Sequence, residues 1–293
     1  MSWEMRFFCA NKLMLRRRAN PAIYGGGKRM PLSILPDEPR LLAGAGYILF
    51  LLCAFLIFCA AGCATMYNPA TGQEEFILIS TEEEIQIGRQ VAAEIQQKYP
   101  IYRDQRLNER INSIGQKIAA VNDRKDLPYY FIILDDDEIN AFTVPGGYVY
   151  VFRGLVDFVK TDEELAGVLA HEVGHVAARH IVKKMQAQMG YELIFTLATR
   201  GKEEYQSIAN FANLAFNLVM LGYSREDEYF ADILAVRYMN RAGYNPRAMI
   251  SFLERLKGEE KGQEPPSFLS THPGIDERIT HIKDEIAMSE QAR

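Results

Sequence analysis

The chain contains the sequence His-Glu-Val-Gly-His at residues 171–175, inside a run with the periodicity of a helix. Residues four apart on a helix are separated by about 40° around the axis and about 6 Å along it. His171 and His175 therefore project from one face and can bind one metal ion. An H-E-x-x-H sequence on a helix is typical of zinc hydrolases, in which the glutamate is the general base. The alternative interpretation is a polar surface face that carries two histidines.

The residues around this motif predict one long helix from Thr161 to about Lys184. Thr161 and Glu164 have the spacing of a capping box. Apolar residues at helical spacing then form a stripe that should be buried, namely Leu165, Val168, Leu169 and Val176. In the middle of such a helix Glu172 lies beside the metal, where it can take a proton from a water that zinc has made acidic.

A catalytic zinc site needs a third protein ligand and an open position for water. The extended pattern H-E-x-x-H-x-x-G-x-x-H is excluded, because the chain has Ala178 and Ile181 where that pattern needs glycine and histidine. His180 does not replace the missing ligand, since nine positions from His171 places it on the opposite face of a continuous helix. The third ligand must come from another part of the chain.

The segment 224–232 reads Ser-Arg-Glu-Asp-Glu-Tyr-Phe-Ala-Asp and begins a second helix that runs to about Arg241. Glu228 and Asp232 are four apart on one face of it. One carboxylate can bind the metal while the other accepts a hydrogen bond from a ligand histidine. Acidic residues also favour the first turn of any helix, so a solvated helix start is the alternative.

Taken together, these segments resemble the zinc metallopeptidases of family M48, which include the CAAX prenyl endopeptidases, the HtpX heat-shock protease and the BepA-type periplasmic proteases. The matches are residues 171–175, the pattern Ser-Arg-x-x-Glu-x-x-Ala-Asp at 224–232, and residues 140–147 and 270–273. The resemblance covers about residues 70 to 288. It implies an α+β fold, a mainly helical gluzincin-type domain with a small β-sheet beside the active-site helix. Without an internal repeat or helical hairpins at the end of the chain, the tandem-repeat domain of some relatives is not expected.

The resemblance also implies residue roles. His171, His175 and Glu228 would bind one Zn²⁺ per chain, although two imidazoles and a carboxylate also accept other divalent ions. Glu172 would be the general base. Asp232 would support a ligand histidine.

His272 and Arg278 match a pair that in the family lies near the catalytic zinc and engages the metal, the substrate or the developing oxyanion. A fixed cation or hydrogen-bond donor stabilises the negative charge that forms when an amide is attacked. The alternative is structural, with His272 before Pro273 capping a short helix and Arg278 on its exposed face.

Two apolar segments, Tyr129–Leu134 and Gly147–Phe152, predict strands that pack before the catalytic helix. By resemblance, Asn140, Ala141 and Phe142 form the edge at which an extended peptide substrate pairs through main-chain hydrogen bonds. A turn at the following Pro-Gly-Gly sequence is compatible with this role.

Residues 41–61 are uncharged and long enough to span a bilayer. Eight Lys or Arg and three acidic residues precede them, so the rest of the chain should be exported. Cys63 follows Ala-Ala-Gly, which resembles a bacterial lipobox with an acylated cysteine. We therefore divide the chain into a leader at 1–62, with Met30 as an alternative start, and a single peptidase domain at 63–293.

The expected location is the periplasmic face of a bacterial envelope, as an outer-membrane lipoprotein or, alternatively, as a domain anchored in the inner membrane by residues 41–61. The exported part has 25 basic and 35 acidic residues, which argues against nucleic acid as a partner. The expected function is hydrolysis of peptide bonds in misfolded or stalled envelope proteins, for quality control of the outer membrane, with an assembly-machinery partner possible. The alternative is an assembly factor or holdase whose protease site is latent or dispensable.

Overall fold

The computed structural model describes residues 48, 50–53, 65–199, 208–260 and 265–291. The chain divides into two units, Met1–Leu56 and Ile57–Arg293. In the first unit the described residues are helical, and their large apolar side chains are exposed. Among the residues that the structure describes, no helix combines the length and apolar character needed to cross a bilayer. Most of the predicted membrane segment 41–61, and Cys63 itself, lie outside the described residues.

The second unit contains a three-stranded sheet in the order β3-β5-β4, with β3 (Tyr130–Leu134), β4 (Ala141–Val144) and β5 (Tyr148–Phe152). Strands β3 and β5 are parallel, and β4 is antiparallel to β5 and forms one edge of the sheet. The two predicted strands are confirmed to within one residue. The turn η1 (Pro145–Gly147) requires glycine, because Gly147 has φ 83° and a Cβ there would lie 1.9 Å from the Pro128 carbonyl oxygen.

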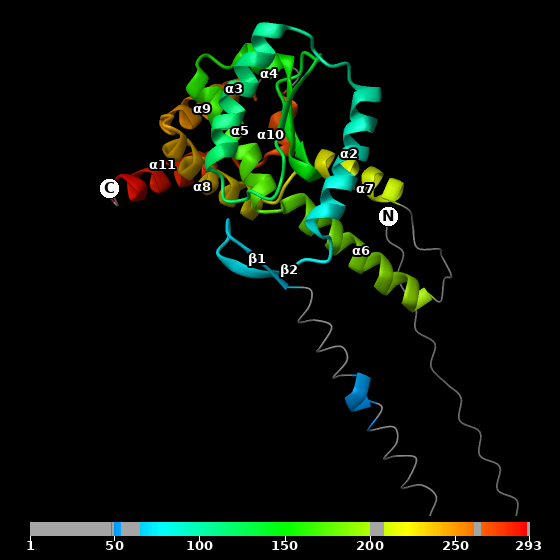
Figure 1. Cartoon of the computed structure of the whole chain (residues 1–293). Helices are drawn as coiled ribbons and strands as arrows, with labels where there is room; N and C mark the ends of the chain where they lie inside the picture. The colour runs from blue at the N-terminus through cyan, green and yellow to red at the C-terminus, as the bar shows by residue number, and fades with distance from the viewer. Residues whose placement is uncertain (1–47, 49, 54–64, 200–207, 261–264, 292–293) are drawn as a thin grey trace, which may run out of the picture. The chain divides into compact units, whose positions relative to one another are not determined.

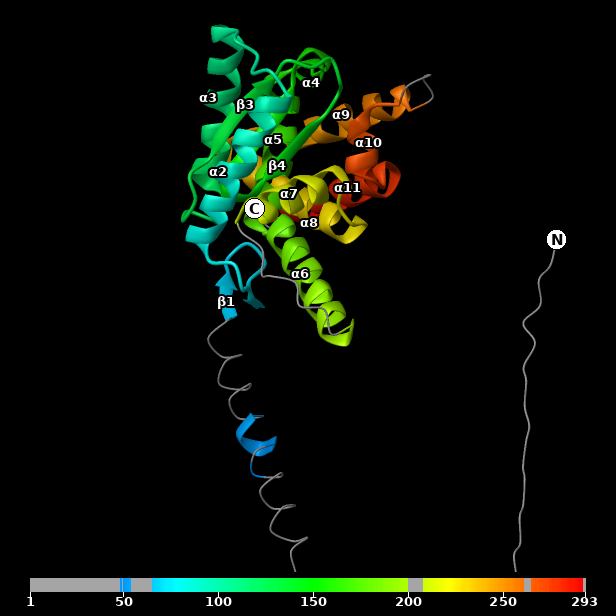
Figure 2. The ribbon, with the colours of Figure 1, turned by 90° about the vertical axis from the view of Figure 1, so that its right-hand side faces the viewer.

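Helices cover both faces of this sheet, which explains why its strands read as continuous apolar runs. On one face lie α3 (Gln105–Val121), α5 (Asp162–Ala177) and α8 (Arg225–Ala242), with α9 (Arg247–Glu259), α10 (Ser267–Thr271) and α11 (Ile275–Gln291) beyond them. The other face is covered by α2 (Thr81–Lys98), α6 (His180–Thr199) and α7 (Ile208–Met220) (Figures 1 and 2). The short helix α4 (Arg153–Phe158) follows β5. This arrangement confirms the predicted mainly helical domain with a small sheet.

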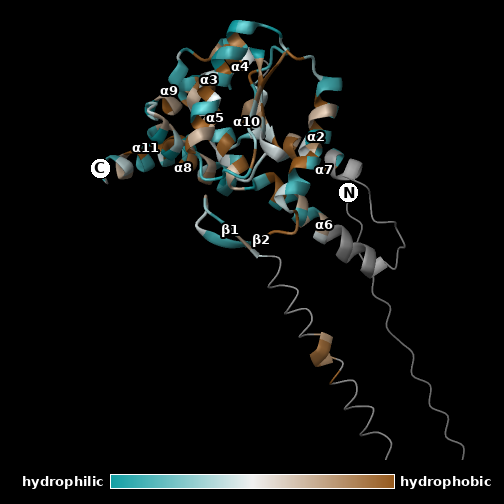
Figure 3. Ribbon diagram, in the orientation of Figure 1, coloured by the Kyte–Doolittle hydropathy of each residue, from teal (hydrophilic) through white to brown (hydrophobic). Residues whose placement is uncertain are grey.

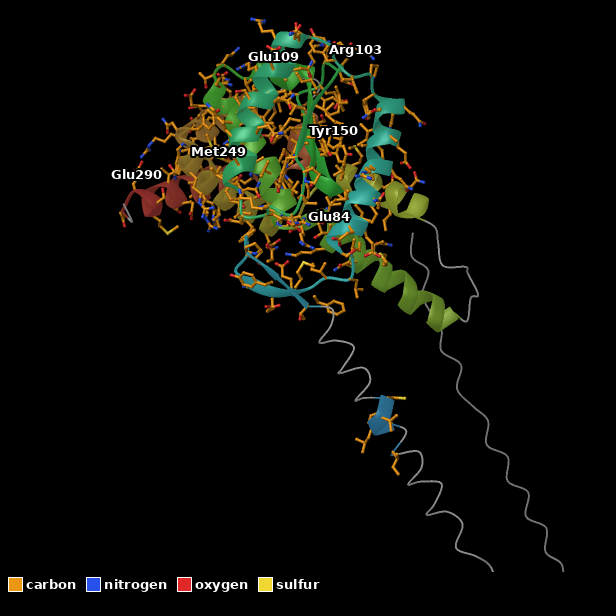
Figure 4. The ribbon with its side chains drawn as sticks, viewed as in Figure 1. Glu84, Arg103, Glu109, Tyr150, Met249 and Glu290 are labelled. Carbon is orange, nitrogen blue, oxygen red and sulfur yellow. The ribbon has the colours of Figure 1, made fainter. Side chains whose placement is uncertain are left out.

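A separate hairpin, β1 (Thr65–Asn68) and β2 (Gln73–Phe76), precedes α2. Ser80 caps α2 and forms a capping box with Glu83. Glu84, labelled in Figure 4, is buried and pairs with the buried Arg124 through two contacts of 2.7 and 3.0 Å.

The prediction of one helix from Thr161 to Lys184 is wrong. Helix α5 ends at Ala177, and Arg179 adopts φ 58°, a left-handed conformation that ends a helix. Helix α6 starts at His180 in a new direction. The break changes which way His180 faces, and this matters for the site.

Candidate metal centre

The two helices that carry the motifs approach each other closely. Gly174, inside the H-E-x-x-H motif, lies against α8, where an added Cβ would be 2.9 Å from the Ala231 carbonyl oxygen. Thr161 caps α5 by accepting from the Glu164 N–H at 3.2 Å. Ser224 caps α8 and forms a capping box with Asp227. The capping residues therefore define where both helices begin. The absence of a side chain at Gly174 lets α5 pack closely against α8.

Three side chains converge between these helices. The Nε2 atoms of His171 and His175 lie 3.0 Å apart. Each is 3.3 Å from a carboxylate oxygen of Glu228. All three residues are at most 1% exposed, so water does not solvate the carboxylate. The structure thus brings together the three residues that the sequence indicates as metal ligands.

His272 contributes a fourth donor atom. Its Nε2 lies 3.2 Å from the carbonyl oxygen of Ala141, which can only accept, so this nitrogen carries the proton. The other nitrogen, Nδ1, is then unprotonated in the neutral ring. It points into the cluster, 3.1 Å from Glu228 Oε1 and 3.3 Å from His171 Nε2.

The donor set fits a divalent cation. Its four donor atoms, from His171, His175, Glu228 and His272, lie within 4.8 Å of one another. Tetrahedral ligands about 2.1 Å from one zinc ion lie about 3.4 Å from each other, close to the separations observed here. Unprotonated ring nitrogens and a carboxylate at such distances repel one another unless a cation or a proton lies between them.

Asp232 and Arg278 support this cluster through direct contacts with two of its residues. Asp232 Oδ1 accepts from His171 Nδ1 at 2.8 Å, which leaves the Nε2 of a neutral His171 free for a metal. The Arg278 guanidinium donates to both Asp232 oxygens at 2.8 Å and lies 2.7 Å from Glu228 Oε2. Arg278 is only 2% exposed, so the predicted alternative of an exposed helix face is wrong.

Charges in the metal-free site follow from these contacts. Burial opposes ionisation of Glu228, but His272, Arg278 and His171 hold the pKa of its carboxyl well below the usual range. Burial and Arg278 lower the pKa of His171, yet Glu228 and Asp232 outweigh them and raise it to about 9. A proton on His171 therefore occupies the cluster at neutral pH when no metal is bound, and a metal must replace it.

His180 is a contact that the sequence reasoning missed. Its Nδ1 lies 2.8 Å from Nδ1 of His175, and its Nε2 lies 3.5 Å from Asp227 Oδ1. Burial lowers the pKa of both imidazoles, that of His180 to about 4, so the two rings are neutral. With the His180 proton on Nε2 facing Asp227, His175 donates through Nδ1 and its Nε2 is free for the metal. The small number of histidines could have indicated this contact, because the chain has only five and four of them belong to this site.

Glu172 lies beside the donor atoms and does not belong to the ligand cluster. It is fully buried, and neither carboxylate oxygen has a hydrogen-bond partner among the described residues. Burial raises the pKa of its carboxyl group. The His272 Nε2 atom is 3.5 Å from Glu172 Oε1. A buried carboxyl group without a hydrogen bond is costly, which is typical of a group kept for reaction.

Tyr223 is a second residue that the sequence did not indicate. Its ring stacks on His175 with centroids 3.7 Å apart, and its buried hydroxyl has no partner among the described residues.

The predicted substrate-binding residues lie next to the cluster. Ala141 and Phe142 belong to the edge strand β4, and both are buried. The carboxamide oxygen of Asn140 lies 3.3 Å from the Thr271 hydroxyl, and the Ala141 carbonyl accepts from His272. The segment around His272 thus covers the edge near the metal site. Substrate pairing at this edge stays a prediction.

Comparisons with known proteins place the chain in a family. A model of "Peptidase family M48" matches residues 105–286. The chain is 28% identical to the beta-barrel assembly-enhancing protease of Escherichia coli K12 over 225 residues, which is 74% of this chain and 46% of that protein. It is 31% identical to the mitochondrial metalloendopeptidase OMA1 of Schizosaccharomyces pombe, also over 225 residues, which is 74% of this chain and 65% of that protein. It is 29% identical over 184 residues to the metalloprotease LoiP of Escherichia coli K12, which is 62% of this chain and 70% of that protein. The chain thus spans about half the length of the assembly-enhancing protease. The residues of the cluster and the family match agree: the chain belongs to peptidase family M48, whose fold is zincin-like.

Proposed function

We propose that the protein is a membrane-tethered, zinc-dependent endopeptidase that cleaves misfolded or stalled proteins of the bacterial envelope. The observation that carries this proposal is the convergence of His171, His175 and Glu228 beside the buried Glu172, whose carboxyl group has no hydrogen bond within the described part of the chain. Relatives named as a beta-barrel assembly-enhancing protease and as a metalloprotease support the class of reaction.

The chemistry divides between the cation and the protein. A divalent cation held by His171, His175 and Glu228 supplies Lewis acidity toward water and the substrate carbonyl. Glu172 removes a proton from the attacking water and later delivers a proton to the leaving amine nitrogen. Since burial raises the pKa of Glu172, its conjugate acid holds that proton more firmly than an exposed carboxyl would. The peptide bond breaks and a carboxylic acid and an amine form.

His272 gives the site a resting state. With Nδ1 among the ligand atoms and Nε2 bonded to Ala141, it takes the fourth position and the nearest acceptor of the edge strand. We infer that the segment around His272 must move before a water and a peptide can enter. A protease that is silent until its substrate displaces a side chain suits a compartment filled with folded proteins.

The proposed location rests on the sequence. Acylation at Cys63 or a membrane helix at 41–61 would tether the domain at the periplasmic face, with the outer membrane favoured. Unfolded outer-membrane proteins and, as a possible partner, their assembly machinery would then be within reach. The competing proposal is a holdase or assembly factor, because a protease site that is permanently latent would show the same closed cluster.

Substitution of Glu172 by Gln separates the two proposals. The variant is expected to keep its metal and to cleave a denatured outer-membrane protein about 10²–10⁴-fold more slowly than wild type. Products are identified by mass spectrometry. Full rescue of a deletion strain by Glu172→Gln would contradict proteolysis as the main role and support the holdase.

His272→Ala tests the resting state in the same assay. Faster cleavage of the denatured substrate is expected if His272 closes the site. Slower cleavage would show instead that His272 acts directly in catalysis.

A further inference from the structure

The hairpin β1–β2 presents an apolar outer face. In its register Thr65 pairs with Phe76 and Tyr67 pairs with Glu74, so these four side chains share one side of the hairpin. Leu78, two residues after Phe76, continues the alternation. Tyr67, Phe76 and Leu78 are 58%, 54% and 55% exposed. Three neighbouring large apolar side chains exposed on so small an element are typical of a surface that another apolar surface covers.

The opposite side fixes the hairpin to the body of the domain. Glu75 pairs with Lys183 of α6 at 2.7 Å. The side chain of Gln186, also on α6, accepts from the N–H groups of Leu78 and Ile79 and donates to the Phe76 carbonyl. The outer face is therefore held in a defined direction and does not turn inward. In Figure 3 the segment that joins β2 to α2 is among the most hydrophobic of the ribbon near the hairpin.

The short connection before Thr65 limits how far the hairpin can lie from the expected membrane anchor. Residues 41–61 are uncharged, and four residue steps join Ala61 to Thr65. If residues 41–61 span the membrane, 3.8 Å for each step places Thr65 no more than about 15 Å from the end of that span. If Cys63 carries the lipid, two steps limit the distance to about 8 Å. With either anchor, the hairpin lies within reach of the headgroup layer of the bilayer.

We infer that the outer face of the β1–β2 hairpin docks into the lipid headgroup region of the membrane that anchors the chain. This inference rests on the tether in the proposed function. Tyr67 has the amphipathic ring typical of membrane interfaces, and Phe76 and Leu78 can enter the boundary of the acyl chains. Glu74, at the tip, can remain in water. Because α6 holds the hairpin and begins at the metal centre, such docking fixes the height of the active site above the lipid.

Tryptophan fluorescence tests this docking in the full chain. The only native tryptophan, Trp3, is first replaced by Phe. Tyr67→Trp then places an indole on the outer face. The matched control is Ile101→Trp, because Ile101 is 39% exposed and follows the other end of α2, an 18-residue helix about 27 Å long. Arg103, labelled in Figure 4, marks that end of the domain.

Both variants are reconstituted in vesicles of phosphatidylethanolamine and phosphatidylglycerol, with and without lipids brominated near the headgroup. We expect bromolipid to quench the indole of Tyr67→Trp and shift its emission to the blue, with no quenching in Ile101→Trp. If the chain floats with the vesicles and Tyr67→Trp shows no more quenching than Ile101→Trp, the docking is refuted while the tether stands. A chain that does not float overturns both the tether and the docking. Thermal unfolding of each variant verifies that the exposed positions tolerate tryptophan.

Discussion

Replacement of Asp232 by Asn tests the support of the metal centre. The Asp232 carboxylate accepts from His171 Nδ1 at 2.8 Å and from Arg278 at two positions, also at 2.8 Å. Asparagine keeps the shape and one acceptor oxygen but loses the negative charge. It therefore weakens the orientation of His171 and also frees Arg278, which lies 2.7 Å from the ligand Glu228.

The expected loss follows from these two contacts. Removal of a partner that orients a metal ligand costs roughly 10- to 100-fold in metal affinity. This corresponds to about 1.4–2.8 kcal/mol of binding free energy. Since Asp232→Asn disturbs both His171 and the guanidinium beside Glu228, we expect a loss toward the upper end of that range.

Competition with a chromophoric chelator measures the Zn²⁺ affinity of wild type, Asp232→Asn and a matched control. Glu226→Gln is that control, since it removes one carboxylate from the exposed side of the same helix. Circular dichroism establishes that each variant is folded. A folded Asp232→Asn protein that binds zinc within twofold of wild type would refute the reasoning.

Three further predictions concern stability and pH. Gly174→Val is expected to lower the free energy of unfolding by about 1–3 kcal/mol through overpacking between α5 and α8. Denaturant titrations measure this loss. Gly190→Val is the control, because an added Cβ at Gly190 meets nothing within 4 Å. Arg124→Met leaves the buried Glu84 without a cation and should cost about 3–5 kcal/mol; a double variant that also carries Glu84→Leu should recover most of it, and equal losses in the two would contradict the pairing. In the metal-free protein the pKa of His171 is raised from 6.5 to about 9, so the stability that its charge contributes is complete below pH 6.5 and is lost as pH rises through 9. Apparent Zn²⁺ affinity should rise over the same interval, because the metal replaces that proton, and a flat pH profile of both quantities would contradict this assignment.

The sequence predicted the elements that local signals define. Caps at Thr161 and Ser224 begin the two ligand helices, and spacing of four places each pair of polar side chains on one face. Alternation and apolar runs located β3 and β5. A motif of fixed spacing on a helix needs no knowledge of the rest of the molecule, which is why His171 and His175 could be paired from the sequence. The assignment of Glu228 as the third ligand came from the resemblance to family M48.

The break between α5 and α6 could not be predicted in the same way. Arg179 adopts a left-handed conformation that glycine usually marks, and here no glycine does so. The position of His180 follows from that break. A prediction of one continuous helix therefore could not place His180 in contact with His175. Pairs such as Glu84 with Arg124, 40 positions apart, depend on tertiary packing and leave no periodic trace.

The most direct test of the central claim is a count of metal ions per chain. Inductively coupled plasma mass spectrometry would be applied to wild type, His175→Ala, Glu228→Ala and the control His281→Ala, whose histidine is exposed and stacks on Tyr229 away from the cluster. We predict one ion per chain in wild type and in His281→Ala, and a large loss in the other two. Unchanged metal content in Glu228→Ala, or no bound metal in wild type loaded with zinc, would contradict the account.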